Sequence, residues 1–268
     1  MGNDTQLDRA LAITPIADGQ FSAVADPNYE ANTGMFGGFT AALLLNGVIQ
    51  SPDASGEPAA LTVNYLNRIE PGTALQVHSS QVRAGRSINH WQSSLASADG
   101  KLYANASVIM ANRKPTRGFD ELRMPQAPAP NPEAQFSPPG TFGENTPNIP
   151  IEGFPPYDQP HSKSLAWVRE KSGRPMDALQ IAYLADVYPP RIWYAGKQPV
   201  PSATITLSVY FLASSDELAA MGDDYVLSEA TGTRAHDSIV GSKLNIWNRQ
   251  GTLLATSEQV SWFSLPEA

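Results

Sequence analysis

The sequence predicts an α+β fold of two tandem units, each with a central helix wrapped by an antiparallel sheet. The first observation behind this prediction is an order of elements that occurs twice: a compact apolar helix, then four strand-like segments with turn residues between them. The second is a proline-rich stretch between the two copies, since about half of the 23 prolines fall within residues 113–160. The third is a sequence similarity between the last hairpins of the two copies.

The first unit is expected to span residues 1–115. A strand-like segment at 21–29 precedes a helix that opens with Gly37 and Gly38 and continues to residue 50. After this helix, apolar and β-branched residues recur between clusters of turn residues, which is typical of antiparallel strands. The four strands are expected at 61–67, 74–85, 88–97 and 102–110.

Residues 116–150 are expected to form a proline-rich linker that crosses the outside of the molecule. The second unit, at residues 151–268, is expected to carry the functional side chains. Its helix is predicted at 177–188, where a pair of prolines ends the helical pattern. Its four strands are expected at 203–214, 225–235, 238–248 and 253–263.

A short sequence similarity supports an internal duplication. Residues 96–107 and 246–257 share a turn glycine, a leucine two positions later and an alanine four positions later, at an offset of 151 residues. Residues 63–66 (VNYL) likewise resemble residues 209–212 (VYFL). Gly100 and Gly251 would close equivalent hairpins, because glycine adopts a positive φ at little cost.

Composition argues against several classes of function. Eighteen Lys and Arg residues stand against 26 Asp and Glu, so the formal charge is −8, and no run of five like charges occurs; a nucleic-acid partner is not indicated. Cysteine is absent, which excludes disulfides, zinc–thiolate sites and a cysteine nucleophile. Neither a secretion signal nor an apolar run long enough to span a membrane is evident, so we expect no membrane association and a cytoplasmic location.

Asp186 occupies an unusual position for an acid. Leu179, Ala182, Tyr183 and Asp186 follow the spacing of one helix face, so the carboxylate falls on the stripe that normally turns toward the core. It also lies just before Pro189, where the negative end of the helix dipole would disfavour its charge. A half-buried acid in this place should have a raised pKa, which suits a general base. The alternative is a partly exposed acid at a frayed helix end.

The helix that opens with two glycines, the long strands after it and the repeat beyond a proline-rich linker resemble the double hot-dog fold of the acyl-CoA thioesterase II family. In that family an Asp near the end of the second helix, a Thr early in the next strand and a Gln on the final strand hold and activate a hydrolytic water. The matching residues here are Asp186, Thr204 and Gln259. The resemblance therefore implies an acyl-CoA thioester hydrolase with an acyl-CoA substrate.

The implied chemistry needs neither a cofactor nor a metal. Asp186 would act as base, while Thr204 and Gln259 would hold the water by hydrogen bonds. Gly37 and Gly38 are candidates for oxyanion or substrate binding, because backbone N–H groups at a helix start favour negative charge. The alternative role for these glycines is close packing of the helix.

A single active site is expected in the chain. Matching the two units places Leu45 or Asn46 opposite Asp186 and Val108 opposite Gln259, so the first unit lacks the polar trio. That unit is expected to supply acyl-chain walls. Further association into a homo-oligomer is possible for such a fold. Candidates for binding the CoA phosphates, each alternatively an ordinary surface cation, are Arg83, Arg86 and Arg234.

Other catalytic patterns are missing from the sequence. No G-x-S-x-G, H-E-x-x-H, G-x-G-x-x-G or Walker motif occurs. The consecutive His236, Asp237 and Ser238 cannot form a triad on a strand, since neighbours point to opposite faces, and a polar turn is the favoured interpretation. The rival function is a non-catalytic protein that binds acyl-CoA or a lipid-like ligand with the same fold.

Overall fold

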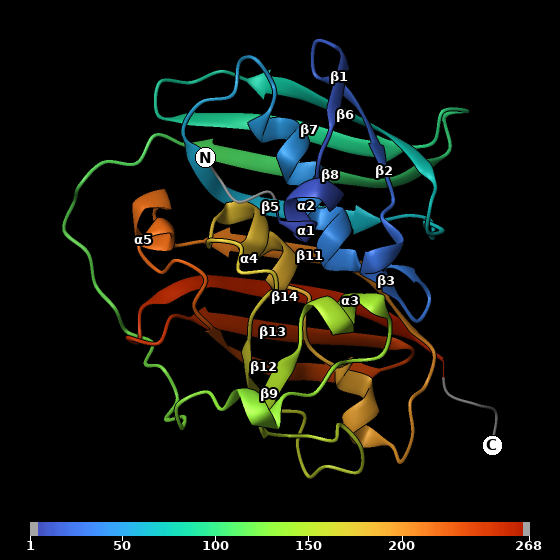
Figure 1. Ribbon diagram of the computed structural model, residues 1–268, viewed down its shortest axis with the longest axis vertical. Coiled ribbons are helices and arrows are strands. Elements are labelled where there is room, and N and C mark those ends of the chain that lie inside the picture. Colours follow the sequence, from blue (N-terminus) through green and yellow to red (C-terminus); the bar gives the residue numbers. More distant parts are fainter. Residues whose placement is uncertain (1–4, 265–268) are drawn as a thin grey trace.

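A computed structural model describes residues 5–264, and its main feature is one antiparallel sheet of twelve strands within that range (Figure 1). The strands follow the order β1-β2-β6-β7-β8-β5-β11-β14-β13-β12-β10-β9. Helices α2 and α4 contact each other and cover the same face of the sheet. This arrangement is the predicted pair of helix-and-sheet units, joined edge to edge through β5 and β11.

The strands have the following bounds in chain order: β1 Thr14–Ala17, β2 Gln20–Val24, β3 Glu30–Ala31, β4 Gly34–Met35, β5 Glu57–Tyr65, β6 Ala74–Arg83, β7 Ile88–Ala96, β8 Leu102–Ala111, β9 Asn148–Glu152, β10 Ser164–Val168, β11 Ser202–Phe211, β12 Val226–His236, β13 Ile239–Trp247 and β14 Leu253–Phe263. The α-helices are α1 Gln6–Ala10, α2 Gly37–Ile49, α3 Thr141–Asn145, α4 Ala178–Leu184 and α5 Ser215–Ala219. Three short 3-10 helices complete the described secondary structure: η1 Pro27–Tyr29, η2 Pro132–Ala134 and η3 Arg191–Ala195.

The strand pairing reveals a pseudo-twofold axis between β5 and β11. Thr62 lies opposite Ser208, and their hydroxyl oxygens are 3.0 Å apart. These two residues are separated by 146 positions, which is also the offset between the similar segments 63–66 and 209–212. A twofold axis between two antiparallel strands places each residue near the axis opposite its equivalent in the other half, and Thr62 and Ser208 are such a pair. The duplication read from the sequence is therefore visible in the sheet.

Irregularities of the two halves also correspond. The β5–β8 pairing skips Ala59 between Pro58 and Ala60, and the β11–β14 pairing skips Ile205 between Thr204 and Thr206. A β-bulge makes such a one-residue skip, and it moves the flanking side chain to the other face of the strand. Because the two bulges lie 146 positions apart, both halves of the sheet bend at the same place.

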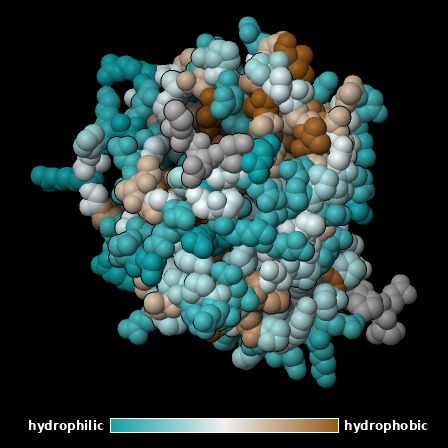
Figure 2. Space-filling model, in the orientation of Figure 1, coloured by the Kyte–Doolittle hydropathy of each residue, from teal (hydrophilic) through white to brown (hydrophobic). Residues whose placement is uncertain are grey.

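Helix α2 forms the centre of the core. Residues 38–48 of this helix are all buried, as expected for a helix that is apolar on every side. Beside it α4 is shorter, and its start is capped by Asp177, whose side chain accepts from the Gln180 backbone N–H at 2.9 Å. Figure 2 shows that the apolar side chains visible on the helix-bearing side of the molecule gather toward the end where β1, β2 and β6 lie.

The structure corrects several predicted boundaries. Each half contributes six strands to the sheet, and three of these twelve strands, β1, β9 and β10, were not predicted. Helix α4 ends at Leu184, earlier than residue 188. The predicted linker, residues 116–150, runs along one side of the molecule in Figure 1 and then forms η2, α3 and the start of β9. Residues 1–4 and 265–268, at the ends of the two predicted units, lie outside the described residues.

Among residues 5–264, no helix has both the length and the apolar character needed to cross a bilayer.

Candidate active site

Asp186 lies just beyond α4, against the start of α2. Ala185 forms the C-cap of α4, and the Val187 N–H then bonds to the Leu184 carbonyl at 3.1 Å, so the acid follows the helix instead of occupying its last turn. The nearby prolines account for this early end, since they restrict the residues before them. A side chain at Gly37 would place its first carbon 2.5 Å from the Asp186 Oδ2 atom. The carboxylate therefore occupies the space that glycine leaves at the α2 start.

Two opposing influences set the charge of Asp186. Burial raises the pKa of this carboxyl to about 7, whereas hydrogen bonds from the Gln259 amide and the Gly38 backbone N–H act to lower it. The residue still keeps part of its surface exposed, so water can reach it. Only the unfavourable dipole of the acid's own helix is evident from the sequence. In the structure the carboxylate also faces the favourable N-terminus of α2.

Gln259 connects Asp186 to Thr204. Its amide nitrogen Nε2 donates to Asp186 Oδ1 at 2.6 Å and to Thr204 Oγ1 at 2.9 Å. The residue is only 7% exposed, and it lies on the inner face of β14, paired with Leu207 and Ser242 on the neighbouring strands. An ionised carboxylate only accepts hydrogen bonds, so Asp186 fixes which end of the amide faces it. The three side chains named by the sequence analysis thus meet in one hydrogen-bonded group.

A β-bulge explains how Thr204 reaches this group. Thr206 and Ser208 have the same parity as Thr204 in the sequence, yet both are directed at the neighbouring strand β5: Thr206 donates to the Val63 carbonyl, and Ser208 contacts Thr62. The skipped residue Ile205 reverses the alternation, so Thr204 pairs with Ser261 and turns inward. Sequence alternation alone could not have shown this.

Three hydroxyl groups that were not predicted from the sequence support the amide of Gln259. Tyr188 Oη donates to the Gln259 Oε1 atom at 3.3 Å, and it also lies 3.2 Å from Ser242 Oγ. Ser261 Oγ donates to the same Oε1 atom at 3.4 Å. Tyr188 stands only two positions after Asp186, which was an available signal. The serines could be found only from the registers of β13 and β14.

The N-terminal half contributes Tyr65 to the border of the site. Its hydroxyl donates to the Gly37 carbonyl at 2.9 Å, and burial together with the charge of Asp186 raises the pKa of this phenol. Tyr65 is the last residue of β5, so the site is formed between the two halves. No feature of the sequence near Tyr65 had indicated this contact.

The two glycines at the start of α2 serve close packing, which was the alternative considered from the sequence. A first side-chain carbon at Gly38 would lie 2.2 Å from the Tyr183 carbonyl oxygen, so only glycine allows α2 and α4 to approach this closely. The Gly38 N–H is engaged by Asp186, whereas Gly37 borders the carboxylate directly. Of the two glycines, Gly37 therefore stays a candidate for oxyanion binding.

The other sequence candidates lie apart from this trio. Asp237 and Ser238 have positive φ values of 46° and 64° and form the turn between β12 and β13. This is the polar turn that was favoured over a triad. Arg83 and Arg234 occupy corresponding places, each flanking a register shift, on β6 and β12 respectively. Arg86 lies in the turn after β6.

The fold and comparison with known proteins together identify the family of this chain. The fold is that of a double hot-dog protein, in which two helices pack on one continuous antiparallel sheet. An acid, an amide and a hydroxyl are in contact at the junction of its two halves. The profile of the acyl-CoA thioesterase N-terminal domain matches residues 25–111, and that of the acyl-CoA thioesterase C-terminal domain matches residues 123–263. The chain belongs to the acyl-CoA thioesterase family.

Solved structures show the same fold over nearly the whole chain. A conserved hot-dog protein of unknown function from Alicyclobacillus acidocaldarius is 28% identical, with a TM-score of 0.92 and coverage of 97% of this chain and 98% of that one. The TesB protein of Mycobacterium avium subs. paratuberculosis (18% identity, TM-score 0.78, coverage 97% and 98%) and the acyl-CoA thioesterase II TesB2 of Mycobacterium marinum (15%, 0.75, 98% and 98%) are also similar. The comparison with curated proteins gives no match.

Proposed function

We propose that this protein hydrolyses an acyl-CoA thioester to a free acid and CoA, using a water activated by Asp186, Thr204 and Gln259. The observation that carries the proposal is the pair of hydrogen bonds from Gln259 Nε2 to Asp186 Oδ1 and Thr204 Oγ1, at 2.6 Å and 2.9 Å. Both amide hydrogens of Gln259 are used in this way. The hydroxyl hydrogen of Thr204 is then available to a water, and so are the remaining lone pairs of Asp186.

The proposed reaction begins with that water. It donates one hydrogen to Asp186 and accepts the hydroxyl hydrogen of Thr204, which leaves a lone pair directed at the thioester carbonyl carbon. As the C–O bond forms, Asp186 takes the proton and the carbonyl oxygen becomes an oxyanion. When the C–S bond breaks, the protonated Asp186 returns a proton to the leaving thiolate. A pKa of about 7 lets the carboxyl perform both transfers near neutral pH.

In the proposal the α2 N-terminus stabilises the oxyanion. The backbone N–H of Gly37 is the assigned donor, because Gly38 already donates to Asp186. A donor at the positive end of a 13-residue helix is well placed to favour developing negative charge. Tyr65, which donates to the Gly37 carbonyl, would hold the next peptide, the one whose N–H is that of Gly38, and so keep the first turn of the helix in position.

The test is release of CoA thiol from a panel of short-, medium- and long-chain acyl-CoAs. Hydrolysis well above the uncatalysed rate for at least one chain length is expected. The same panel, measured by equilibrium binding, identifies the rival function. If acyl-CoAs bind but none is hydrolysed above background, the protein is a ligand-binding member of the fold and the proposed reaction is wrong.

A further inference from the structure

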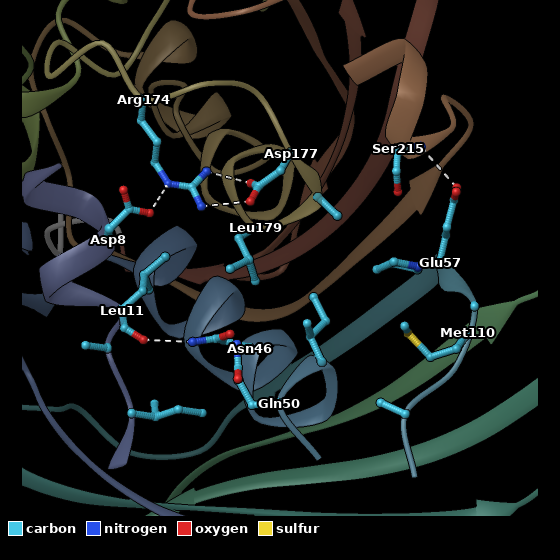
Figure 3. A pocket seen from close by; sticks show the side chains of 17 residues that line it. Asp8, Leu11, Asn46, Gln50, Glu57, Met110, Arg174, Asp177, Leu179 and Ser215 are labelled. Atoms are coloured by element: carbon cyan, nitrogen blue, oxygen red, sulfur yellow. Dashed lines mark hydrogen bonds and ion pairs between the residues drawn. The ribbon is translucent and has the colours of Figure 1, made fainter. Parts of the chain in front are cut away.

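A cavity lies at the end of the helix pair opposite to Asp186. It has a volume of about 620 Å³, within the usual range for small-molecule sites (Figure 3). Asn46 and Gln50, at the end of α2, line it, together with Asp177 and Ala178 at the start of α4. At the opposite end of the helix pair, beside Asp186, Thr204 and Gln259, the order of the helix ends is reversed: the end of α4 faces the start of α2.

Strand registers identify this cavity as the pseudo-twofold counterpart of the catalytic site. Its walls include Pro58 and Met110, which pair with each other beside the β5 bulge. The offsets that relate the two halves are 146 residues for β5 and β11 and 151 residues for β8 and β14. With these offsets, Pro58 corresponds to Thr204 and Met110 corresponds to Ser261. Thr204 and Ser261 likewise pair with each other beside the β11 bulge. Asn46, one of the two residues expected opposite Asp186, is part of the same wall.

The connections after the two central helices explain why the cavity exists. Only residues 50–56 link α2 to β5, whereas residues 185–201 link α4 to β11. The longer connection contains η3, whose Ile192 packs in a small apolar cluster with Val240 and Phe263. No comparable segment stands between α2 and β5, so the space beside Pro58 remains hollow.

The chemistry of the walls suits a neutral, elongated ligand. Apolar side chains such as Ile49, Leu179 and Met110 alternate with polar ones. Asn46 is 6% exposed; its Nδ2 donates to the Leu11 carbonyl at 2.8 Å, and its Oδ1 has no hydrogen-bond partner among the described residues. This oxygen is itself buried, so a ligand amide N–H would bond to it only once the Asn46 side chain turns toward the cavity, and that bond would remove the cost of leaving the oxygen unpaired.

Charges in the cavity disfavour an anionic ligand inside it. The Arg174 guanidinium is engaged by Asp8, at 2.7 Å from Nε, and by Asp177, at 2.6 Å and 2.7 Å from the terminal nitrogens (Figure 3). These two carboxylates outweigh the single cation. Glu57, another wall residue, accepts from the Ser215 backbone N–H at 3.1 Å and is paired with Arg113 Nε at 3.2 Å, so the excess negative charge comes from Asp8 and Asp177. A free fatty acid would therefore meet negative charge, whereas an uncharged amide and thioester would not.

We infer that this cavity binds the acyl-pantetheine arm of a second acyl-CoA molecule without hydrolysing it. The ligand class rests on the proposed function, because the cavity is the counterpart of the site assigned to acyl-CoA. No hydrolysis is expected there, because Pro58 stands in place of Thr204 and Val108 in place of Gln259, and the wall carboxylates of Asp8 and Asp177 are held by Arg174. The chain then has one hydrolytic and one purely binding site.

Binding stoichiometry tests the inference. S-Decyl-CoA, a thioether that cannot be hydrolysed, should bind with two equivalents per chain in isothermal titration calorimetry. Ala54→Trp, which fills the cavity from the short connection, should reduce this to one equivalent while kcat/KM for decanoyl-CoA stays within about twofold of wild type. Ala129→Trp, an exposed position in the 116–150 segment, is the matched control and should retain two.

A second variant removes the hydrogen-bonding group without filling the cavity. Asn46→Leu should weaken the second equivalent by about five- to tenfold, the loss expected for one hydrogen bond, and decanoate should not compete for it. One equivalent in both wild type and Ala54→Trp, with hydrolysis intact, overturns the second site and leaves the proposed function standing. Two equivalents without any hydrolysis would reject the proposed reaction instead.

Discussion

The two halves of this protein share their sheet order, their bulges and their helix packing, yet among the described residues only the second half joins an acid, an amide and a hydroxyl in one hydrogen-bonded group, whereas the buried serines of the first half, Ser79 and Ser93, bond to each other. Gln259 pairs with Leu207 and Ser242, while its counterpart Val108 pairs with Leu61 and Trp91. The bulge that turns Thr204 inward in one half turns Pro58 inward in the other. The backbone geometry of the site is therefore present in both halves. The chemistry depends on a few side chains placed on it.

Asp186→Asn should give the largest effect on activity. The substitution keeps the shape but removes the proton acceptor, so kcat should fall by roughly 10²- to 10⁴-fold with a much smaller change in substrate binding. Stopped-time thiol-release assays at saturating acyl-CoA measure this directly. Asn46→Ala, at the counterpart end of the helix pair, should leave kcat nearly unchanged. Full turnover by the Asp186→Asn variant would end the proposed role of the acid.

The same substitution should stabilise the fold in a pH-dependent way. Because burial raises the folded-state pKa of Asp186 to about 7, well above its ordinary 3.8, the neutral acid contributes stability that is complete below about pH 4 and is lost as the pH rises through 7. Asparagine does not ionise, so the variant loses no stability as the pH rises. A flip of the Gln259 amide would let its oxygen accept a hydrogen bond from the asparagine side chain. Urea unfolding should therefore show a gain on the order of 2–4 kcal/mol for the variant at pH 8 and little difference at pH 4.

If the unfolding free energies of wild type and Asp186→Asn differ by the same amount at pH 4 and at pH 8, the raised pKa of Asp186 is wrong. Asp120→Asn, which alters an exposed carboxylate, provides the control for non-specific effects of charge. Its unfolding free energy should follow that of the wild type at both pH values.

Much of the fold could be predicted because apolar strands, turn glycines and the repeated order are local signals. The additional strands β9 and β10 lack such signals. All five residues of β10 are buried, so no alternation marks it, and Pro150 interrupts β9. The site was predictable only as a set of residue types. The inward turn of Thr204 depends on a bulge, and the contact of Tyr65 with Gly37 depends on how two distant halves pack.

Thr204→Ala and Gln259→Ala should each reduce kcat by about 10- to 100-fold, less than the loss of the acid. In the proposed reaction both residues act on the same water as Asp186, so each substitution should add little in the Asp186→Asn background. Val108→Ala is the matched control for Gln259→Ala. It removes a core side chain and should lower the unfolding free energy by about 1–3 kcal/mol without lowering kcat. Additive losses across the trio would mean that the three side chains do not share one water.

Tyr188→Phe should have the smallest effect on turnover and tests how the amide of Gln259 is held. The tyrosine hydroxyl donates to Gln259 Oε1 and contacts Ser242, so it favours the orientation in which Nε2 faces Asp186. Without it, Ser261 still donates to Oε1 at 3.4 Å, and we expect a loss in kcat of only about three- to tenfold. The ring should stay in place, because Arg191 stacks over it at 5.1 Å from the centroid. In a Gln259→Ala background the loss should vanish, since there is no amide left to orient. A loss of the same size in that background would show that Tyr188 acts on the substrate or the water and not through Gln259.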